Sequence, residues 1–329
     1  MQIFVTGATG FVGGHLLREL AARGHQVRAL VRTRKKGEPL ETFIDRTIVG
    51  DLFSEAALAE GLAGADAVIH VAGMLAARRQ ATLWRVNVDG TKALLRAARA
   101  TPGGIPRFVY VSSIAAAGPS RPGEPLVEQD PPRPVSVLGE TKLAAERAVQ
   151  AHADAFPFSI LRPPIVFGPG DQDNFPVFAM VQAGNVWTVG QMRVQLSVLF
   201  VTDLAVAIAD AVESPAAANQ PYFVAADARP RFVELIQGIE EALGARARVR
   251  TVPRFLAKAV AAGNDAWRVL RGSSNLLNRD KINELLAPGW LCSTQKIKRE
   301  LGWQPQVGVQ EGIRMTAEWY LDRGWLERG

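Results

Sequence analysis

The sequence predicts an α/β fold, in which a doubly wound parallel sheet is joined to a smaller and mostly helical C-terminal region. Short β-rich runs alternate with amphipathic helical stretches through the first half of the chain, and this alternation is typical of a parallel sheet with helices on both faces. A glycine-rich turn directly follows the first predicted strand. Right-handed crossovers between the parallel strands then give the doubly wound order.

The predicted elements follow one another closely along the chain. We expect strands at residues 3–5, 26–31, 47–49, 67–71, 108–112 and 159–161, and a last returning strand at residues 222–225. We expect helices at residues 11–22, 54–62, 81–100 and 140–155. The proline-rich segment at residues 118–134 is long for a connector, and loops of this kind often carry function. From about residue 231 the pattern is mostly helical, with loops.

The composition is that of a globular protein with a moderate positive charge. The 329 residues carry a formal net charge of +6, and the Lys and Arg residues are scattered along the chain. Because no long basic run is interleaved with aromatic residues, we expect no nucleic-acid partner. No uncharged apolar stretch approaches the roughly 20 residues of an integral membrane span. The stretch at residues 255–270 is interpreted as a packed amphipathic helix, with contact to a membrane surface as the alternative.

Cys292 is the only cysteine of the chain, which excludes a disulfide within the chain and a cysteine-based metal site. The first residues read as a strand because they lack a basic segment followed by a long apolar one. We therefore expect a cytoplasmic protein. His70 lies in an apolar strand without clustered partners, so we interpret it as a core histidine and expect no metal.

The glycine-rich turn carries the clearest functional signal. Gly7 lets the chain turn tightly, Gly10 lets a pyrophosphate approach the backbone, and Gly13 lets the next helix pack close to the strand. Phosphates then lie on the free N–H groups at the positive end of that helix. The spacing is one residue longer than Gly-x-Gly-x-x-Gly, but the position between a strand and an amphipathic helix predicts a dinucleotide site.

The length of the chain favours two closely packed domains. We expect a dinucleotide-binding domain at residues 1–165, with a returning segment at about residues 200–225. Residues 166–199 and 226–329 then form the substrate-binding domain.

The segment from Thr6 to Gly13 resembles the cofactor motif of the extended short-chain dehydrogenases/reductases. This family includes nucleotide-sugar epimerases and dehydratases, 3β-hydroxysteroid dehydrogenases and dihydroflavonol-type reductases. The resemblance covers nearly the whole chain, because further motifs of the family follow in the right order. They lie at residues 50–52, 70–73, 87–91, 110–113, 162–169, 200–203 and 301–305.

The resemblance implies a Rossmann-type fold that binds a nicotinamide dinucleotide. It implies that Asp51 contacts the adenine, that residues 70–73 lie beneath the nicotinamide-side ribose, and that residues 162–169 close over the nicotinamide. The expected cofactor-binding residues are Gly7, Thr9, Gly10, Phe11, Val12, Gly13, Arg32, Asp51, Leu52, Val71, Ala72, Gly73, Asn87, Lys142, Pro163 and Val166. As in relatives, the helices at residues 81–100 and 140–155 could build a homodimer.

The end of the second strand indicates which dinucleotide binds. An acidic residue there favours NAD, whereas an arginine suits the additional 2′-phosphate of NADP. Here the strand ends at Arg32, with Arg34, Lys35 and Lys36 following and no carboxylate at the strand end. We predict NADP as the cofactor, with NAD as the second choice; the alternative interpretation is a solvated loop of charges.

The catalytic pattern of the family is incomplete in this chain. The resemblance implies a Tyr that transfers a proton, a Lys four residues later on the same helix face, and a Ser that binds the reacting oxygen. Ser113 and Lys142 occupy the Ser and Lys positions and are the expected catalytic residues, but Leu138 occupies the Tyr position. Leucine cannot transfer a proton, and none of Tyr110, Tyr222 and Tyr320 lies four residues before Lys142.

Three interpretations of this gap remain open. The chain is an oxidoreductase or epimerase that acts on a carbonyl or hydroxyl with another proton donor, for which the candidates are Ser113, Ser136, Thr141 and an ordered water. Alternatively, it is a catalytically weak or inactive cofactor-binding sensor or assembly subunit. In the third interpretation, Leu138 is a substitution in an otherwise ordinary enzyme.

The segments expected to cover the substrate cleft favour an apolar small molecule. In this architecture ligands lie at the carboxyl ends of the strands, where residues 72–80, 115–134 and 167–195 gather. Leu138 would also face this cleft. The apolar candidates there are Met74, Leu75, Phe167, Phe175, Phe178, Trp187 and Met192, and the polar ones are Arg78, Arg79, Asp171, Gln191, Arg193 and Gln195. The alternative is that the aromatic residues pack the core between the two domains.

Overall fold

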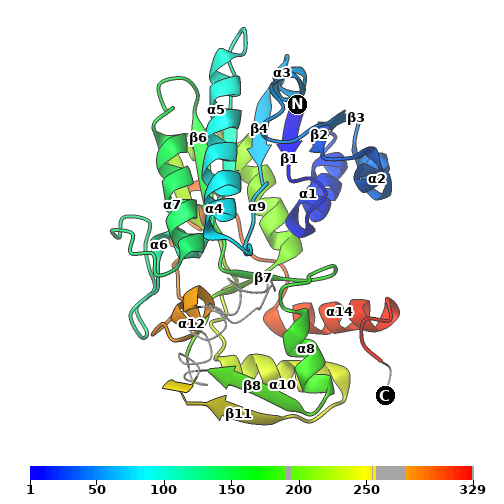
Figure 1. The fold of residues 1–329 in the computed structure, drawn as a ribbon, viewed down its shortest axis with the longest axis vertical. Helices are drawn as coiled ribbons and strands as arrows, with labels where there is room; N and C mark the ends of the chain where they lie inside the picture. Colours follow the sequence, from blue (N-terminus) through cyan, green and yellow to red (C-terminus); the bar gives the residue numbers. More distant parts are fainter. Residues whose placement is uncertain (190–193, 254, 257–278, 328–329) are drawn as a thin grey trace.

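A computed structural model describes residues 1–189, 194–253, 255–256 and 279–327 (Figure 1). A seven-stranded parallel sheet forms the larger part of the fold, in the order β10-β6-β5-β4-β1-β2-β3. The strands are β1 (Gln2–Thr6), β2 (Gln26–Val31), β3 (Arg46–Val49), β4 (Ala67–His70), β5 (Phe108–Val111), β6 (Phe158–Arg162) and β10 (Gln220–Phe223). The doubly wound parallel sheet that the sequence predicts is therefore confirmed.

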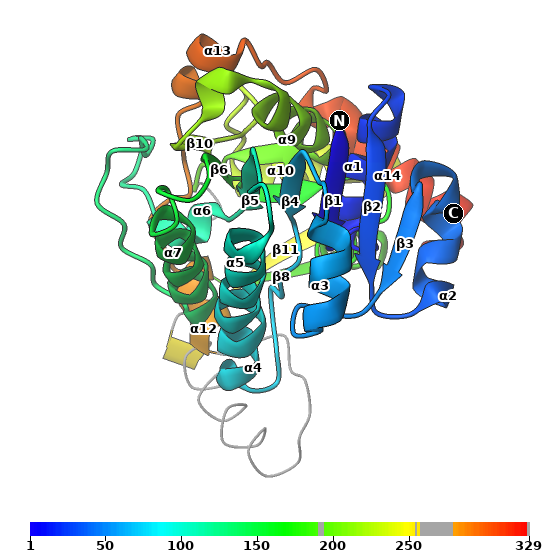
Figure 2. The same cartoon turned by 90° about the horizontal axis from the view of Figure 1, so that it is seen from above.

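Helices cover both faces of this sheet, as Figure 2 shows. The helices α1 (Phe11–Ala22), α9 (Val201–Glu213) and α13 (Gln295–Leu301) share one apolar core with the sheet. The helices α3 (Glu55–Leu62), α5 (Gly90–Ala100) and α7 (Val137–Gln150) share the core on the opposite face. The central strands β1, β4 and β5 are buried on both faces and are mostly apolar, as expected for a parallel sheet.

Several predicted boundaries are wrong, each for a local reason. The single helix expected at residues 81–100 is α4 (Gln80–Trp84), a π-helical turn at Arg85–Asp89 and then α5. The helix expected at residues 140–155 is α7, which begins earlier because Ser136 caps it by accepting a hydrogen bond from the N–H of Gly139. The returning strand is β10, which begins two residues earlier than expected.

A smaller unit packs below the sheet in the view of Figure 1. Its helices α8 (Phe175–Gln182), α10 (Phe232–Leu243) and α14 (Val309–Asp322) surround an apolar core of their own. Two short parallel strand pairs, which the sequence did not predict, belong to this part: β7 (Ile165–Phe167) with β9 (Val198–Phe200), and β8 (Asn185–Val189) with β11 (Arg248–Val252). Three further α-helices of the described residues are short: α2 (Arg34–Gly37), α6 (Ile114–Ala117) and α12 (Arg279–Leu285).

Residues 257–270 of the predicted amphipathic helix lie outside the described residues. Within the described part of the chain, no helix is both long enough and apolar enough to cross a membrane.

Candidate functional site

The strand order places the candidate site at the carboxyl ends of β1 and β4. From β1 the chain winds outward through β2 and β3, and it then returns to the other side of β1 with β4. Open α/β sheets bind ligands in the crevice at such a reversal. Gly7 follows β1 and Val71 follows β4, so both predicted site segments begin at this point.

The glycine turn is closed by backbone contacts that admit no side chain. Gly7 has φ +80°, and a Cβ atom on it would lie 2.5 Å from the backbone N of Ala72. A Cβ on Gly13 would lie 2.1 Å from the carbonyl oxygen of Gly7. The turn therefore packs directly against the segment after β4 and against the first turn of α1.

The face of the turn that points to solvent fits a pyrophosphate. Thr9 and Gly10 are exposed, and a Cβ on Gly10 would approach only the oxygen of Gly7, at 3.3 Å. The helix α1 begins at Phe11 and has no acidic residue in its first turn. The N–H groups of Phe11, Val12 and Gly13 lie in the first turn of the helix, where no carbonyl oxygen of the same helix can accept from them. Such free N–H groups bind an anion favourably.

The predicted adenine end lies beside β2 and β3. Arg32 is exposed directly after β2, where no other side chain of the described residues hydrogen-bonds it. The Oδ1 atom of Asp51 accepts hydrogen bonds from the N–H of Phe53 (2.9 Å) and the hydroxyl of Ser54 (3.0 Å). The side chain of Leu52 is buried and fills the space beside Gly90. Its side chain therefore packs in the apolar core, next to Asp51.

Three predicted residues from distant parts of the chain meet after β4. A Cβ on Gly73 would lie 3.2 Å from Nζ of Lys142 and 3.3 Å from Oδ1 of Asn87. Asn87 holds the loop in place, since its amide exchanges hydrogen bonds with the N–H (2.8 Å) and C=O (3.0 Å) of Met74. It also donates to the hydroxyl of Thr141 at 3.1 Å.

Lys142 is a buried ammonium group at the edge of the crevice. Its side chain donates from Nζ to the carbonyl oxygen of Val111 at 3.0 Å, and the residue is 4 % exposed. Burial lowers the pKa of Lys142 to about 8, and the carboxylate of Glu146 acts in the opposite direction. Ribose hydroxyls accept hydrogen bonds from such a group, so the residue present fits the predicted ribose contact.

Of the candidate donors, Ser113 has the freest hydroxyl. It caps α6 by accepting a hydrogen bond from the N–H of Ala115 at 3.1 Å, which leaves its own hydrogen for a ligand. Thr141 donates its hydroxyl hydrogen to the carbonyl oxygen of Leu138 at 2.8 Å. Ser136 is buried at the start of α7.

The three tyrosines are buried away from the position of Leu138. Tyr222 donates to Glu300 at 3.0 Å, and Tyr320 donates to the carbonyl oxygen of Asp171 at 2.7 Å. The ring of Tyr110 lies 5.2 Å beneath Nζ of Lys142, and its hydroxyl is enclosed in the core. Burial raises the pKa of all three hydroxyls above the usual value.

His70 is a core histidine, as the sequence suggests. Thr91 donates to the carbonyl oxygen of Asn87, so Nε2 of His70 is the donor in its 2.9 Å contact with Thr91. Its Nδ1 then accepts from the hydroxyl of Thr6 at 2.6 Å. Burial, aided by the charge of Lys142, lowers the pKa of His70 to about 3 and keeps the ring neutral.

The segment after β6 reaches across the crevice. The carbonyl oxygen of Pro163 accepts a hydrogen bond from the N–H of Ile114 at 2.8 Å, next to Ser113. Val166 is partly buried on β7. Further on, the ring of His15 on α1 donates to the carbonyl oxygen of Pro169 at 2.9 Å. The predicted closing segment is thereby tied to both the segment that carries Ser113 and the helix α1.

Most of the predicted cleft aromatics belong to the core of the smaller unit. Phe167 and Phe178 are buried there, and the ring of Phe175 packs edge-on against Tyr320. Asp171 is also buried, and its carboxylate closes the turn by accepting from Asp173 and Asn174. The expectation that these side chains line the cleft is wrong for Phe167, Phe178 and Asp171, because side chains that are enclosed in a core cannot contact a ligand.

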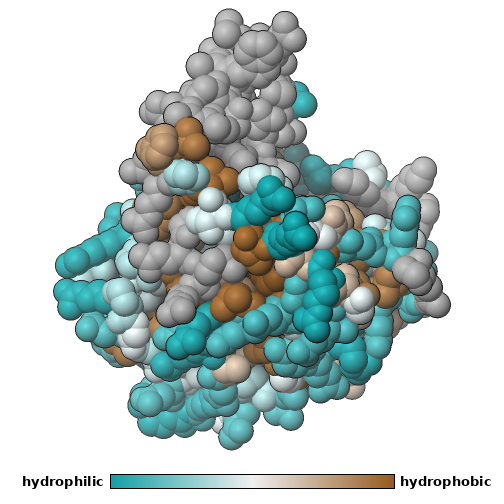
Figure 3. Space-filling model, turned by 90° about the horizontal axis from the view of Figure 1, so that it is seen from below, coloured by the Kyte–Doolittle hydropathy of each residue, from teal (hydrophilic) through white to brown (hydrophobic). Residues whose placement is uncertain are grey.

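The apolar candidates that remain near the site are Leu75, which is 56 % exposed, Met74 and Leu138. Trp187 is exposed on β8, beneath the guanidinium of Arg250. Seen from below, apolar residues are exposed among polar ones at several places on the surface (Figure 3). Gln191, Met192 and Arg193 lie outside the described residues.

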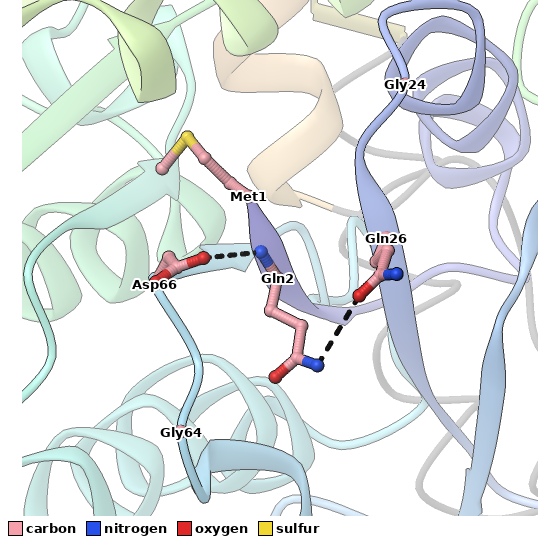
Figure 4. A pocket seen from close by; sticks show the side chains of 6 residues that line it. All are labelled: Met1, Gln2, Gly24, Gln26, Gly64 and Asp66. Atoms are coloured by element: carbon pink, nitrogen blue, oxygen red, sulfur yellow. Dashed lines mark hydrogen bonds between the residues drawn. The ribbon is translucent and has the colours of Figure 1, made fainter.

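An open hollow of about 390 Å³ lies at the opposite end of the sheet. Figure 4 shows its lining, which includes Gln2 and Gln26 at the amino ends of β1 and β2 and Asp66 before β4. The carboxylate of Asp66 accepts from the N–H of Gln2 at 2.6 Å. Because ligands of parallel sheets bind at the carboxyl ends, this hollow is not part of the candidate site.

Sequence reasoning missed one group that the structure places behind Lys142. Glu146 is fully buried and pairs with Arg162 through two contacts, of 3.0 and 2.6 Å. The sequence does contain one signal for Glu146. It follows Lys142 by four residues, which places both side chains on the same face of α7.

Comparisons with known proteins agree with this geometry. The sequence model of the NAD-dependent epimerase/dehydratase family matches residues 3–225. The ceramide reductase of Caulobacter vibrioides is 32 % identical over 327 residues, which cover 99 % of this chain and 96 % of that protein. The 4-hydroxy-2-methyl-3-oxo-4-farnesyl-3,4-dihydroquinoline-1-oxide ketoreductase of Stigmatella aurantiaca is 31 % identical over 322 residues, 95 % of each chain.

A third relative and a solved structure are also similar to this chain. The 2-alkyl-3-oxoalkanoate reductase of Stenotrophomonas maltophilia is 31 % identical, over 95 % of this chain and 98 % of that protein. Among solved structures, MoeE5 in complex with UDP-glucuronic acid and NAD is 25 % identical, with a TM-score of 0.78 over 99 % of this chain and 100 % of that one.

Proposed function

Because this chain belongs to the NAD-dependent epimerase/dehydratase family, we propose that it is an NADPH-dependent reductase of a ketone on an apolar small molecule. The family consists of extended short-chain dehydrogenases/reductases, and the relatives of this chain are named reductases, dehydrogenases and epimerases. A nicotinamide dinucleotide is therefore its cofactor type, and an oxidoreductase or epimerase is its enzyme class. The choice of ketone reduction, NADPH and an apolar substrate is our proposal.

The observation that carries the choice of reaction is the pair of Ser113 and Leu138. Oxidation and epimerisation of an alcohol begin with removal of its proton, which requires a base beside the hydroxyl. Leu138 provides none, and the hydroxyl of Ser113 is a weak base. In ketone reduction the neutral serine hydroxyl can donate a hydrogen bond to the carbonyl oxygen, and the alkoxide that forms there is basic enough to take its proton from water. The printed names of three relatives, a ceramide reductase, a ketoreductase and an oxoalkanoate reductase, support reduction as the direction.

The residues around the crevice then have distinct roles. The bound dinucleotide supplies a hydride. Ser113 donates a hydrogen bond to the carbonyl oxygen of the substrate, and a water that reaches this oxygen supplies the proton. Lys142 binds the ribose, Asn87 fixes the loop beneath it, and the turn from Gly7 to Gly13 with Thr9 binds the pyrophosphate. Arg32 pairs with the 2′-phosphate, and Asp51 contacts the adenine.

The substrate class follows from the polarity of the crevice and the relatives. Leu138 replaces a polar hydroxyl with a methyl-bearing side chain, and Leu75 is exposed on the loop after β4. In our proposal residues 1–165 and about 200–225 bind the cofactor, while residues 166–199 and 226–329 enclose the substrate. A homodimer through α5 and α7 remains part of this proposal.

The direct test is consumption of NADPH by the purified chain. We expect turnover with long-chain 3-oxo compounds or other apolar ketones, and much less with nucleotide sugars. Equal or faster turnover of a nucleotide sugar would contradict the substrate class. Absence of turnover with every ketone, despite tight NADPH binding, would contradict reduction and favour a cofactor-binding role.

Reversing the charge of Arg32 should change the cofactor preference. In Arg32→Glu we expect the affinity for NADPH to fall about 10- to 100-fold, since a charged hydrogen bond of roughly 1.5–3 kcal/mol is lost. The affinity for NADH should remain the same or rise. Arg229→Glu, at an exposed position between β10 and α10, changes the net charge equally and should have little effect. Fluorescence titration of both cofactors measures the result; tighter NADH binding by the wild type would contradict NADPH as the cofactor.

Removal of the Ser113 hydroxyl should slow the reaction. In Ser113→Ala we expect kcat to fall about 10²- to 10³-fold, as for the loss of a donor to a reacting oxygen. Ser136→Ala is the matched control because Ser136 also caps a helix. It should cost about 1 kcal/mol of unfolding free energy and leave kcat nearly unchanged. Similar kcat values for both variants would exclude Ser113 as the donor.

A further inference from the structure

A buried polar cluster lies directly behind Lys142, between the sheet and α7. It consists of Ser112 directly after β5, Glu146 on α7 and Arg162 at the end of β6, and all three residues are buried. The proposed reaction gives none of them a direct role. A buried charge pair costs desolvation energy and adds little net stability compared with apolar packing. A contribution to stability therefore does not explain why these charges are buried here.

The polar side chains of the cluster are hydrogen-bonded to one another. Arg162 donates from Nε and Nη2 to the two oxygens of Glu146, at 3.0 and 2.6 Å, which is the bidentate arrangement that fixes both groups. The hydroxyl of Ser112 donates to Oε1 of the same carboxylate. One carboxylate therefore joins the ends of two strands to the middle of α7.

Each member of the cluster adjoins a residue of the candidate site. Ser112 precedes Ser113, and Arg162 precedes Pro163. Glu146 follows Lys142 by one helical turn and lies on the same face of α7. The cluster thus fixes the spacing between the proposed carbonyl donor and the proposed ribose contact.

Glu146 is the acidic member of the cluster, which Arg162 makes neutral as a whole, and its carboxylate raises the pKa of the Lys142 ammonium. Among the described residues, the other ionisable groups that face Lys142 are His70 on β4 and Tyr110 on β5. The pKa of His70 is lowered and that of Tyr110 is raised, so both rings are neutral near pH 7. Arg162 on β6 is engaged with Glu146. The charge of Glu146 opposes the effect of burial on the pKa of Lys142, which is about 8.

We propose that Glu146, held by Arg162 and Ser112, is a positioning residue that keeps Lys142 in its charged form and aligns it with Ser113. This inference rests on the proposed contact between Lys142 and the ribose. Below its pKa the ammonium is present and donates to the ribose; above it the proton is lost and cofactor affinity falls. Without the charge of Glu146, this loss begins at lower pH.

The test measures the pKa of Lys142 directly, by NMR titration of ¹³Cε-labelled lysines in the free protein. The signal of Lys142 is assigned by its absence in Lys142→Met. In Glu146→Gln we expect the pKa to fall by about one pH unit or more, because an opposite charge nearby has been removed. Glu140→Gln removes the same charge from an exposed position of the same helix and should leave the pKa unchanged.

Binding of NADPH between pH 6 and 10 provides the second readout. The pH above which affinity declines should fall in Glu146→Gln by the same amount as the pKa of Lys142. An unchanged pKa in a folded Glu146→Gln would overturn the proposal, because a purely structural pair lowers stability without moving the titration. If that variant does not fold, Glu146→Gln with Arg162→Met removes both charges and allows the same measurement.

The two proposals can fail separately. If NADPH does not bind to the wild type at any pH, the proposed cofactor is wrong, whereas the pKa of Lys142 still decides the role of Glu146. If NADPH binds and Lys142→Met binds it equally well, the ribose contact is wrong, and the positioning role is overturned with it.

Discussion

Leu138→Tyr is expected to raise kcat for ketone reduction about 100-fold. Leu138 lies in the first turn of α7, four residues before Lys142 and on the same helix face, so a tyrosine there would extend its ring beside the ammonium. The hydroxyl would supply the proton donor that the chain lacks at this position, and general acid catalysis is typically worth about 10²- to 10⁴-fold. Turnover with the best ketone of the substrate panel measures the effect.

Two matched variants identify the cause of such a gain. Leu138→Phe introduces the same ring without the hydroxyl and should not exceed the wild type. In the Leu138→Tyr variant, addition of Lys142→Met should remove most of the gain, because the ammonium stabilises the ionised form of the phenol. A fall in kcat in Leu138→Tyr with no change in stability would instead mean that the leucine belongs to a working alternative site.

The elements of the fold that could be predicted from the sequence are those whose sequence patterns lie within the element itself. The strands β1, β2 and β5 and the helix α1 were predicted almost to the residue because continuous apolar runs, a glycine turn and amphipathic spacing are local patterns. The strand pair β8 and β11 was not predicted. Each of these strands is stabilised by a partner about 60 residues away along the chain. In addition, β11 carries exposed arginines and is not recognised as a strand from its apolar residues.

The same distinction holds for the candidate site. The family resemblance named Gly73, Asn87 and Lys142 one by one as cofactor-binding residues, and the structure brings the three together. The location of Phe167 and Phe178 could not be predicted, because an aromatic residue near a cleft and one in a core look alike in sequence. The pairing of Glu146 with Arg162 joins a helix to a strand, so no pattern within either segment reveals it.

Gly13→Ala is expected to weaken NADPH binding about 100-fold. The new Cβ atom would lie 2.1 Å from the carbonyl oxygen of Gly7 and 2.7 Å from that of Ala8, and both are backbone atoms that cannot rotate away. The turn must therefore move off the start of α1, and the N–H groups lose their alignment with the pyrophosphate. Forced overpacking costs about 1–3 kcal/mol, and about 1.4 kcal/mol corresponds to a tenfold change in affinity.

The neighbouring glycine separates this effect from a general sensitivity of the helix. A Cβ on Gly14 would meet nothing closer than the side chain of Leu40, at 3.8 Å. Gly14→Ala should therefore bind NADPH as the wild type does, and it should raise the midpoint of thermal unfolding, since alanine favours a helix by up to about 1 kcal/mol over glycine. If both variants lose affinity equally, the sensitivity belongs to the helix α1 as a whole. Loss in Gly13→Ala alone, in a protein that remains folded, assigns the pyrophosphate to the glycine turn, because the two substitutions add the same methyl group to adjacent positions and differ only in what that group meets.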